Sequence, residues 1–250
     1  MSLPNHADAL PGTWNFRDIG GTPTPAGPVR RGIVYRSASL AQLDPNGVAA
    51  LEKLGVTDVF DLRGELEIGR DGKDQVPDTV TVTVAPFHPE EDEAAVHELQ
   101  EDAATPTTQA ERVIAYYAGI PVQPPAQVAV AGLLRTVANG SGGVLVHCAA
   151  GKDRTGWAIA ALLTVAGADR DAVLADYLLS NAAIESLRGW LQEHYGDAYD
   201  TSRQVLGVEP IYLQAAWDSV EKNFGSFDGY LAAIGIDDDV VQRVRRRLVG

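Results

Sequence analysis

The sequence predicts an α/β fold in which a central, mainly parallel sheet is flanked by helices. Short apolar strand patterns alternate with helical patterns up to residue 147, and the chain from residue 154 onward is helical almost throughout. The 250 residues include 45% hydrophobic and 22% charged residues, a composition typical of globular proteins. We therefore expect a single domain over residues 1–250, with a helical insertion and a helical C-terminal part.

Four segments are expected to form strands, because each is short, apolar in pattern and bounded by turn residues. They are residues 29–36 (VRRGIVYR), 56–62 (VTDVFDL), 79–85 (TVTVTVA) and 142–147 (GGVLVH). The third segment alternates between threonine and valine, and the fourth carries a continuous apolar run that is typical of a buried strand.

Helices are expected between and after these strands. The first has Asp44 as its N-cap, Pro45 in its first turn and Gly55 as its stop, and another ends at Gly140 before the fourth strand. The helices expected after the fourth strand cover residues 154–167, 169–181, 184–196, 210–225, 227–235 and 237–248. Residues 88–121 differ in composition from the rest of the chain: they are acidic, alanine-rich and helical in pattern, so we interpret them as the insertion.

The charge balance excludes some classes of partner. A formal net charge of −14 repels nucleic acid and anionic bilayers, so we expect no nucleic-acid partner and no stable membrane association. Basic residues in the last turns of a helix match its dipole, so the arginines near the C-terminus are interpreted as a solvated helix end. They are Arg243, Arg245, Arg246 and Arg247.

No signal-peptide pattern or membrane-length apolar stretch is found in the sequence, so a cytoplasmic location is expected, while export without a signal peptide stays open. A single cysteine cannot form an internal disulfide, so it is either a small core residue or a reactive thiol.

That cysteine, Cys148, follows the fourth strand and precedes a turn at Gly151 and a helix that begins near Thr155. This order points backbone N–H groups and a helix N-terminus at one position, which suits a phosphate. The same positive field stabilises the thiolate, the nucleophilic form of the side chain. We therefore expect Cys148 to be the nucleophile and Ala149, Ala150 and Gly151 to bind the substrate phosphate.

The side chains that follow the loop fit the same chemistry. The planar fork of Arg154 is expected to hold two phosphate oxygens, and Thr155 is expected to hydrogen-bond the sulfur and make it a better leaving group. Lys152 adds a second positive charge. Two roles for it stay open: an ion pair with Asp153, or contact with a second phosphate or acidic group of the substrate.

The residues His147-Cys-x-x-Gly-Lys-x-Arg-Thr-Gly156 resemble the Cys-x5-Arg signature of the cysteine-based protein tyrosine phosphatases. Other segments are similar to the bacterial branch of that superfamily that includes the secreted mycobacterial tyrosine/lipid phosphatase. They are Asn15-Phe-Arg-Asp-Ile-Gly-Gly21, Tyr35-Arg-Ser-Ala38, Asp61-Leu-Arg63, Tyr212-Leu-Gln-Ala-Ala216 and Tyr230-Leu231. The resemblance covers nearly the whole chain and implies a phosphatase-like fold. It also implies a two-helix lid, which would fall at residues 88–121; an acidic surface hairpin of helices without a gating role is the alternative.

The general acid must come from another segment than in many tyrosine phosphatases, because their Trp-Pro-Asp loop is absent from the sequence. Family members with a Gly-Lys-Asp-Arg loop are thought to use the aspartate at the position of Asp153. The alternative role of Asp153 is a salt bridge to Lys152 or to Arg63 that shapes the loop. Asp61 is the second candidate, and its alternative role is to hold Arg36 or Arg63 in place. Asp61 and Arg63 are also placed among the expected substrate-binding residues.

The resemblance implies a cysteine-dependent hydrolase of phosphate monoesters that forms a phosphocysteine intermediate and uses no metal and no cofactor. His147 is expected to orient the loop through hydrogen bonds. We expect a phosphotyrosine protein as the main substrate, with phosphoinositide or dual-specificity activity as the alternative. An inactive phospho-binding module would have lost Cys148 or Arg154, and a rhodanese-like sulfurtransferase would not need Arg154, so both are ranked lower. The oligomeric state stays open.

Overall fold

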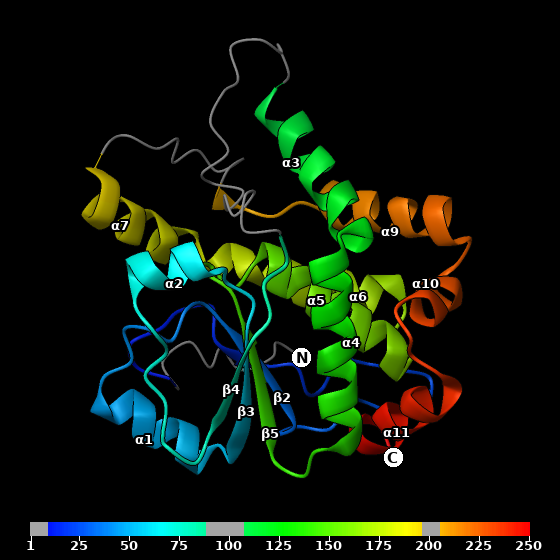
Figure 1. The fold of residues 1–250 in the computed structure, drawn as a ribbon, viewed down its shortest axis with the longest axis horizontal. Coiled ribbons are helices and arrows are strands. Elements are labelled where there is room, and N and C mark those ends of the chain that lie inside the picture. The colour runs from blue at the N-terminus through cyan, green and yellow to red at the C-terminus, as the bar shows by residue number, and fades with distance from the viewer. Residues whose placement is uncertain (1–9, 89–107, 197–205) are drawn as a thin grey trace.

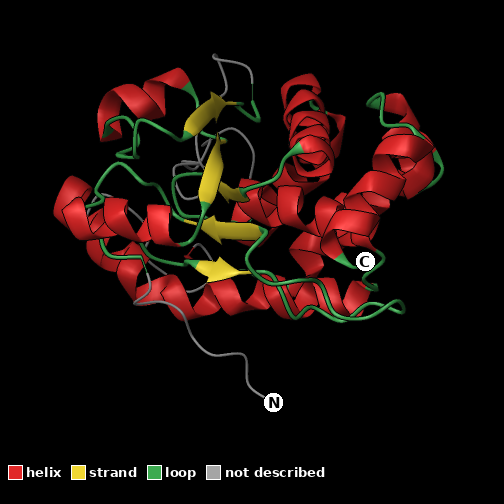
Figure 2. Cartoon of the chain, turned by 90° about the horizontal axis from the view of Figure 1, so that it is seen from below, coloured by secondary structure: helices red, strands yellow, loops and turns green. Residues whose placement is uncertain are grey.

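The computed structural model describes residues 10–88, 108–196 and 206–250. A five-stranded sheet with the order β1-β2-β5-β3-β4 lies between helices on both of its faces (Figures 1 and 2). Only the edge strand β1 is antiparallel to its neighbour; the other three pairs are parallel. The strands are β1 (Arg17–Asp18), β2 (Val34–Ser37), β3 (Val56–Asp61), β4 (Thr81–Val84) and β5 (Gly143–His147). The predicted α/β fold with a mainly parallel sheet is confirmed.

The central strand β5 is buried along its whole length because both faces of the sheet are covered. Val144 and Val146 belong to the larger hydrophobic core, whereas Leu145 points into a smaller core on the other face. A strand enclosed on both faces has no exposed position for a polar residue. This explains the apolar run that predicted the strand.

Helix α1 (Pro45–Lys53) covers the smaller core and begins as predicted. The Asp44 carboxylate accepts a hydrogen bond from the amide of Gly47 (2.8 Å), and Gly55 follows the helix with φ +69°. The larger core lies among α4 (Pro124–Asn139), α5 (Asp153–Ala166), α9 (Pro210–Phe224), α10 (Phe227–Ala233) and α11 (Asp238–Leu248). Helices α6 (Arg170–Leu178) and α7 (Ile184–Tyr195) complete the C-terminal part. No helix in the described ranges is long and apolar enough to cross a membrane.

Two short elements were not predicted. β1 has only two residues, and α2 (Glu65–Asp71) has seven, of which only Glu67 is buried. A helix that buries a single carboxylate has no apolar stripe, so the hydrophobic pattern gives no signal for it.

The expected insertion at residues 88–121 is only partly described, because residues 89–107 lie outside the described ranges. Its later part forms α3 (Gln109–Gly119), which begins with Thr108 and Glu111 capping each other's backbone amides. Val113, Tyr117 and Ile120 belong to the larger core. This part of the segment therefore packs as core, and its expected role as a lid over the site stays a prediction.

The arginines at the end of α11 are only partly solvated. Arg245 donates to the carbonyl oxygen of Val165 (2.8 Å), and Arg247 donates to that of Val137 (2.8 Å). These carbonyl groups lie in the last turns of α5 and α4, which need external donors. Arg245 is exposed, as the interpretation as a solvated helix end predicts, but both residues also join α11 to two core helices.

Candidate active site

The cysteine loop (residues 148–152) joins the carboxyl end of β5 to the start of α5. Gly151 has φ +67°, in the left-handed region that favours glycine, and a Cβ atom there would lie 2.1 Å from the carbonyl oxygen of Ser37. Glycine therefore lets the loop turn this close to the end of β2. Cys148 is only 2% exposed, so its thiol lies at the floor of the site.

Two polar side chains hold carbonyl groups of the cysteine loop. The Asn15 amide donates to the carbonyl oxygens of Gly151 (2.9 Å) and Ala150 (3.3 Å). Arg36 donates to the carbonyl oxygen of Gly151 (2.8 Å). Both residues come from segments that resemble the phosphatase family, so part of that resemblance is explained by support of the loop.

These contacts engage the carbonyl groups of the cysteine loop and leave its backbone amides available to bind a ligand. The amide of Ser39 donates to the carbonyl oxygen of Ala149 (3.0 Å), so three successive loop carbonyl groups are engaged. Since the N–H of a trans peptide points opposite to its C=O, the amides of Ala150 and Gly151 face away from these partners. Neither amide donates a hydrogen bond within the described parts of the chain. Buried, unpaired N–H groups that converge in a turn bind anions.

A second layer of charged residues holds these supports. Asp176 on α6 pairs with Arg36 (2.6 Å) and with Arg17 (2.8 Å), and Arg17 also donates to the side-chain oxygen of Asn15 (2.6 Å). All four residues are buried. The sequence analysis missed Asp176, because a lone aspartate in a helical pattern carries no signal of its partners.

Arg154 is held from one side by Glu67. Its Nη2 donates to Oε1 (2.7 Å) and its Nη1 donates to Oε2 (2.5 Å) and to the carbonyl oxygen of Leu62 (3.3 Å). A guanidinium group has five N–H donors, so the Nε–H and one Nη2–H have no acceptor among the described residues. These two donors lie parallel on one edge of the group, which suits two oxygens of a phosphate.

Glu67 was missed by the sequence analysis because it lies on the unpredicted helix α2. Burial raises the pKa of Glu67, but the charge and hydrogen bonds of Arg154 outweigh this and lower it to about 2. The carboxylate is therefore charged at neutral pH and forms a permanent partner for Arg154. A glutamate four positions after Arg63 is the only sequence signal that could have indicated it.

Asp153 is the first residue of α5 and is buried beside the loop. Its Oδ1 accepts a hydrogen bond from the hydroxyl of Tyr117 on α3 (2.6 Å), and its Oδ2 lies 3.7 Å from Nζ of Lys152. The structure thus shows the predicted ion pair between Lys152 and Asp153. The alternative pairing of Asp153 with Arg63 is not formed in the described structure.

The hydroxyl of Thr155 differs from the prediction. It is buried and has no hydrogen-bond partner among the described residues, so the expected bond to the Cys148 sulfur is not formed. Thr155 nevertheless lies in the first turn of α5, next to Arg154.

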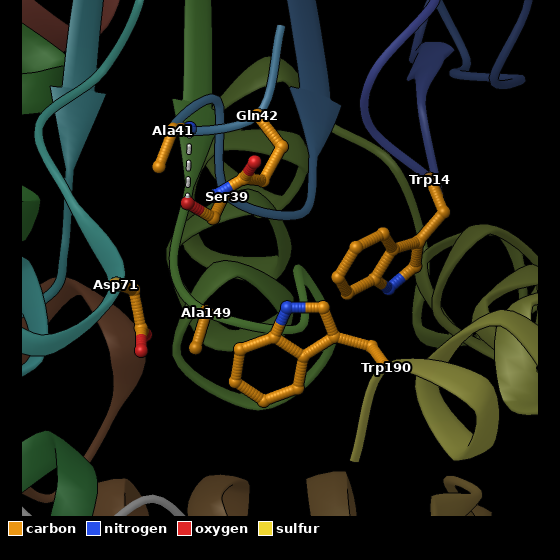
Figure 3. Close-up of a pocket in the computed structure, with 7 residues that line it drawn as sticks. All are labelled: Trp14, Ser39, Ala41, Gln42, Asp71, Ala149 and Trp190. Carbon is orange, nitrogen blue, oxygen red and sulfur yellow. Dashed lines mark hydrogen bonds between the residues drawn. The ribbon is translucent and has the colours of Figure 1, made fainter. Parts of the chain in front are cut away.

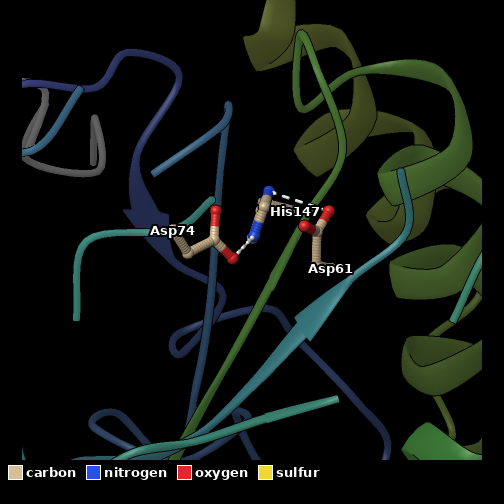
Figure 4. Close-up of side chains that lie close together, drawn as sticks. All are labelled: Asp61, Asp74 and His147. Atoms are coloured by element: carbon tan, nitrogen blue, oxygen red, sulfur yellow. Dashed lines mark hydrogen bonds and ion pairs between the residues drawn. The ribbon is translucent and has the colours of Figure 1, made fainter. Parts of the chain in front are cut away.

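His147 lies directly beneath the cysteine loop, between two carboxylates (Figure 4). Its Nε2 is 2.8 Å from Oδ2 of Asp74, its Nδ1 is 3.2 Å from the carbonyl oxygen of Cys148, and Oδ1 of Asp61 lies 3.8 Å from Nδ1. Burial lowers the pKa of His147, but Asp74 and Asp61 raise it to about 9. The ring is therefore an imidazolium at neutral pH, and the expected role of His147 in orienting the loop fits these contacts.

Arg63 joins the two carboxylates of this cluster. It is fully buried and pairs with Asp61 (2.8 Å) and with Asp74 (2.9 Å). The ligand atoms of Asp61, Asp74 and His147 lie within 4.8 Å of one another, as in a cation site. Arg63 and the imidazolium already neutralise both carboxylates, so the cluster does not fit a metal ion.

The predicted roles of Asp61 and Arg63 in binding substrate stay predictions, because the structure places both in this buried network. The alternative role of Asp61, to hold Arg63 in place, matches the observed contacts: Arg63 donates from Nε to Oδ1 (2.9 Å) and from Nη2 to Oδ2 (2.8 Å).

A hollow opens beside the cysteine loop, next to Ala149 (Figure 3). Trp14 and Trp190 form one wall, with their ring centroids 6.2 Å apart. The other lining residues are Ser39, Ala41, Gln42 and Asp71. The approach to the loop is therefore partly aromatic.

A buried thiol below converging amides and a guanidinium edge is the arrangement that a cysteine-dependent phosphatase needs. Comparison with known sequences agrees, because the pattern of the tyrosine phosphatase family matches residues 9–250. The chain belongs to this family. The predicted class, a protein tyrosine phosphatase and hence a hydrolase, is confirmed.

Two curated relatives show how far the similarity extends. The triple specificity protein phosphatase PtpB of Mycobacterium tuberculosis is 36% identical, over 96% of this chain and 98% of that protein. A putative tyrosine-protein phosphatase of Cupriavidus necator is 32% identical, over 94% of this chain and 86% of its own. The crystal structure of P. aeruginosa TpbA aligns with 82% of this chain and 89% of that one, with 19% identity and a TM-score of 0.35, which is too low to bear on the fold.

Proposed function

We propose that the protein hydrolyses phosphate monoesters through a phosphocysteine intermediate on Cys148, without a metal ion. The observation that carries the proposal is a set of donors near the thiol that have no acceptor in the described parts of the chain: the amides of Ala150 and Gly151 and one edge of Arg154. Together they can donate hydrogen bonds to the oxygens of a phosphate group at the sulfur, where negative charge develops in the transition state.

In the first step the Cys148 thiolate attacks phosphorus, the S–P bond forms and the P–O bond to the leaving group breaks. Asp153 gives its proton to the leaving oxygen. In the second step a water molecule attacks phosphorus, Asp153 takes a proton from it, and the S–P bond breaks to release inorganic phosphate and the thiolate.

Asp153 is preferred over Asp61 as the acid on the basis of their hydrogen bonds. Both oxygens of Asp61 accept hydrogen bonds from Arg63, which leaves no oxygen suited to carry a proton. Among the described residues, Asp153 accepts one hydrogen bond, at Oδ1, and its Oδ2 lies 3.7 Å from Nζ of Lys152.

A phosphotyrosine protein is the proposed main substrate. Cys148 is only 2% exposed, so a long aryl ester reaches the sulfur more easily than a short alkyl ester. The indole rings of Trp14 and Trp190 beside the loop add a surface that suits an aromatic substrate.

Phosphoinositides and phosphoserine or phosphothreonine are the second candidate. The mycobacterial relative is named a triple specificity phosphatase, which supports a wider range of substrates than phosphotyrosine alone. The absence of a nucleic-acid partner and of stable membrane association remains a proposal, supported by the net charge of −14. A cytoplasmic location remains a proposal as well.

The test is turnover of a phosphotyrosine peptide, a phosphoserine peptide and a soluble phosphoinositide by the wild type, Cys148→Ser and Lys152→Ala. We expect phosphotyrosine to be turned over fastest, Cys148→Ser to be folded and inactive, and Lys152→Ala to slow phosphoinositide turnover selectively. Activity of folded Cys148→Ser near the wild-type rate would refute the mechanism. A uniform fall in Lys152→Ala would assign Lys152 to the loop, through its pair with Asp153.

A further inference from the structure

A chain of hydroxyl groups links two helices to Asp153. The hydroxyl of Tyr177 on α6 donates to the hydroxyl of Tyr117 on α3 (2.6 Å), and that hydroxyl donates to Oδ1 of Asp153 (2.6 Å). Tyr117 is fully buried, Tyr177 is 1% exposed and Asp153 is 6% exposed. Water therefore hardly competes for these hydrogen bonds.

We propose that Tyr117 is a positioning residue for Asp153, which it holds with Oδ1 as an acceptor so that the catalytic proton is carried by Oδ2. The inference rests on the proposed role of Asp153 as the general acid. A tyrosine hydroxyl has one hydrogen, and in Tyr117 it is committed to Oδ1, because the oxygen of Tyr117 is already the acceptor for Tyr177. A proton on Oδ1 would remove that acceptor, so Oδ2 is the site left for it.

The geometry around Tyr117 keeps the hydroxyl in place. Its ring stacks on Tyr212 of α9, with centroids 5.7 Å apart and an interplanar angle of 29°, and meets Tyr177 edge-on at 6.2 Å. Burial, followed by the nearby Asp153 charge, raises the pKa of Tyr117 well above its ordinary value, so the hydroxyl stays protonated as a donor. Once Asp153 has lost its proton, Tyr117 and Lys152 both stabilise the carboxylate.

Other titratable groups also face Asp153, and any pH dependence includes their contribution. The loop and α5 supply Cys148, Lys152 and Arg154, and helices α3, α6 and α9 supply Tyr116, Tyr117, Tyr177 and Tyr212. Of these residues, Tyr117 is the one that donates a hydrogen bond to the carboxylate in the described structure, so a change at Tyr117 is the direct way to perturb it.

The experiment compares Tyr117→Phe with the wild type on two substrates, one with a basic leaving group such as phosphotyrosine and one an ester of an acidic phenol. We expect kcat/KM to fall roughly tenfold on the first and by less than about twofold on the second, because only the first needs protonation by a positioned acid. Loss of the donor makes the carboxylate form of Asp153 less stable, so the alkaline limb of the pH profile moves to higher pH.

Two further variants separate positioning from folding. Tyr177→Phe removes the donor to Tyr117 but keeps the bond to Asp153, so we expect a smaller shift of the alkaline limb in the same direction. Tyr230→Phe changes an equally buried tyrosine on α10, packed against Trp157, and should leave both the pH profile and the substrate ratio unchanged. If Tyr117→Phe does not fold, the pH profile of Tyr177→Phe decides, and an unchanged profile overturns the inference.

The double variant Tyr117→Phe with Asp153→Asn tests whether Tyr117 acts through Asp153. We expect it to be no slower than Asp153→Asn alone, because the two changes remove one function. Equal losses on both substrates in Tyr117→Phe, with an unmoved pH profile, would overturn the inference while leaving the phosphatase mechanism intact. Failure of the mechanism itself would instead appear as turnover by Cys148→Ser.

Discussion

Glu67→Gln tests whether Arg154 depends on a buried carboxylate for its orientation. The substitution keeps the size and shape of the side chain but removes its charge, and it places an amide group where an oxygen now accepts a hydrogen bond from Arg154. The guanidinium, which is 4% exposed, is then left without its anionic partner. Removing one member of a buried ion pair is costly because the other charge stays desolvated.

The size of the expected loss in folding stability follows from the pKa of Glu67. Burial raises this pKa, but Arg154 lowers it further, so that it falls from 4.5 to about 2, which corresponds to roughly 3 kcal/mol of stability. Because the folded-state pKa is lowered, this stability is fully present above pH 4.5 and is lost as the pH falls toward 2. We therefore expect Glu67→Gln to lower the free energy of unfolding at pH 7 by roughly 3 kcal/mol.

Urea unfolding at pH 7, with and without inorganic phosphate, measures the effect. Phosphate should stabilise Glu67→Gln more than the wild type, because in the variant the anion supplies the missing partner of Arg154. Turnover should fall about 10- to 100-fold, since a misplaced guanidinium no longer meets the transition state. Glu65→Gln, on the exposed face of the same helix, is the matched control. Wild-type stability and turnover in Glu67→Gln would refute the argument.

Three more outcomes are expected. Burial lowers the pKa of His147, but Asp74 raises it to about 9. Roughly 3 kcal/mol of folding stability is therefore fully present below pH 6.5 and is lost as the pH rises through 9. Asp74→Asn should remove most of this pH dependence, as measured by urea unfolding. Gly151→Ala should abolish turnover of an aryl phosphate, because its Cβ would lie 2.1 Å from the Ser37 carbonyl oxygen, and a near-normal rate would contradict that. Asp153→Asn should slow esters of basic leaving groups far more than those of acidic phenols, and equal losses in steady-state rates would assign Asp153 a structural role.

Most of the fold could be predicted because its elements have strong local signals. α1 has a capping aspartate, a proline in its first turn and a glycine after its end, and β5 is an apolar run between turns. The cysteine loop could also be predicted, since its glycine, cysteine and arginine lie within seven consecutive residues. A site built from residues that are close in the sequence can therefore be predicted from the sequence.

The supports of the loop could not be predicted in this way, because they are remote in sequence. Glu67 lies 87 positions from Arg154, and Asp176 lies 140 positions from Arg36. Tyr117 lies in a segment that was predicted to be an insertion because it is acidic and alanine-rich, but the Tyr117 ring packs in the core. A buried polar residue is specified by its partner, and the partner is known only once the chain is folded.

The charge arrangement explains how a protein with a net charge of −14 can offer a phosphate site. Buried arginines around the cysteine loop pair with carboxylates: Arg36 with Asp176, which Arg17 shares, and Arg154 with Glu67. The loop therefore does not depend on a broad positive field, which would also attract nucleic acid. In the proposed mechanism the loop attracts phosphate through the amides of Ala150 and Gly151 and one edge of Arg154, groups that act over hydrogen-bond distances and in fixed directions. Such donors bind a tetrahedral oxyanion that fits between them, so the geometry of the donors, rather than the net charge of the protein, selects the ligand.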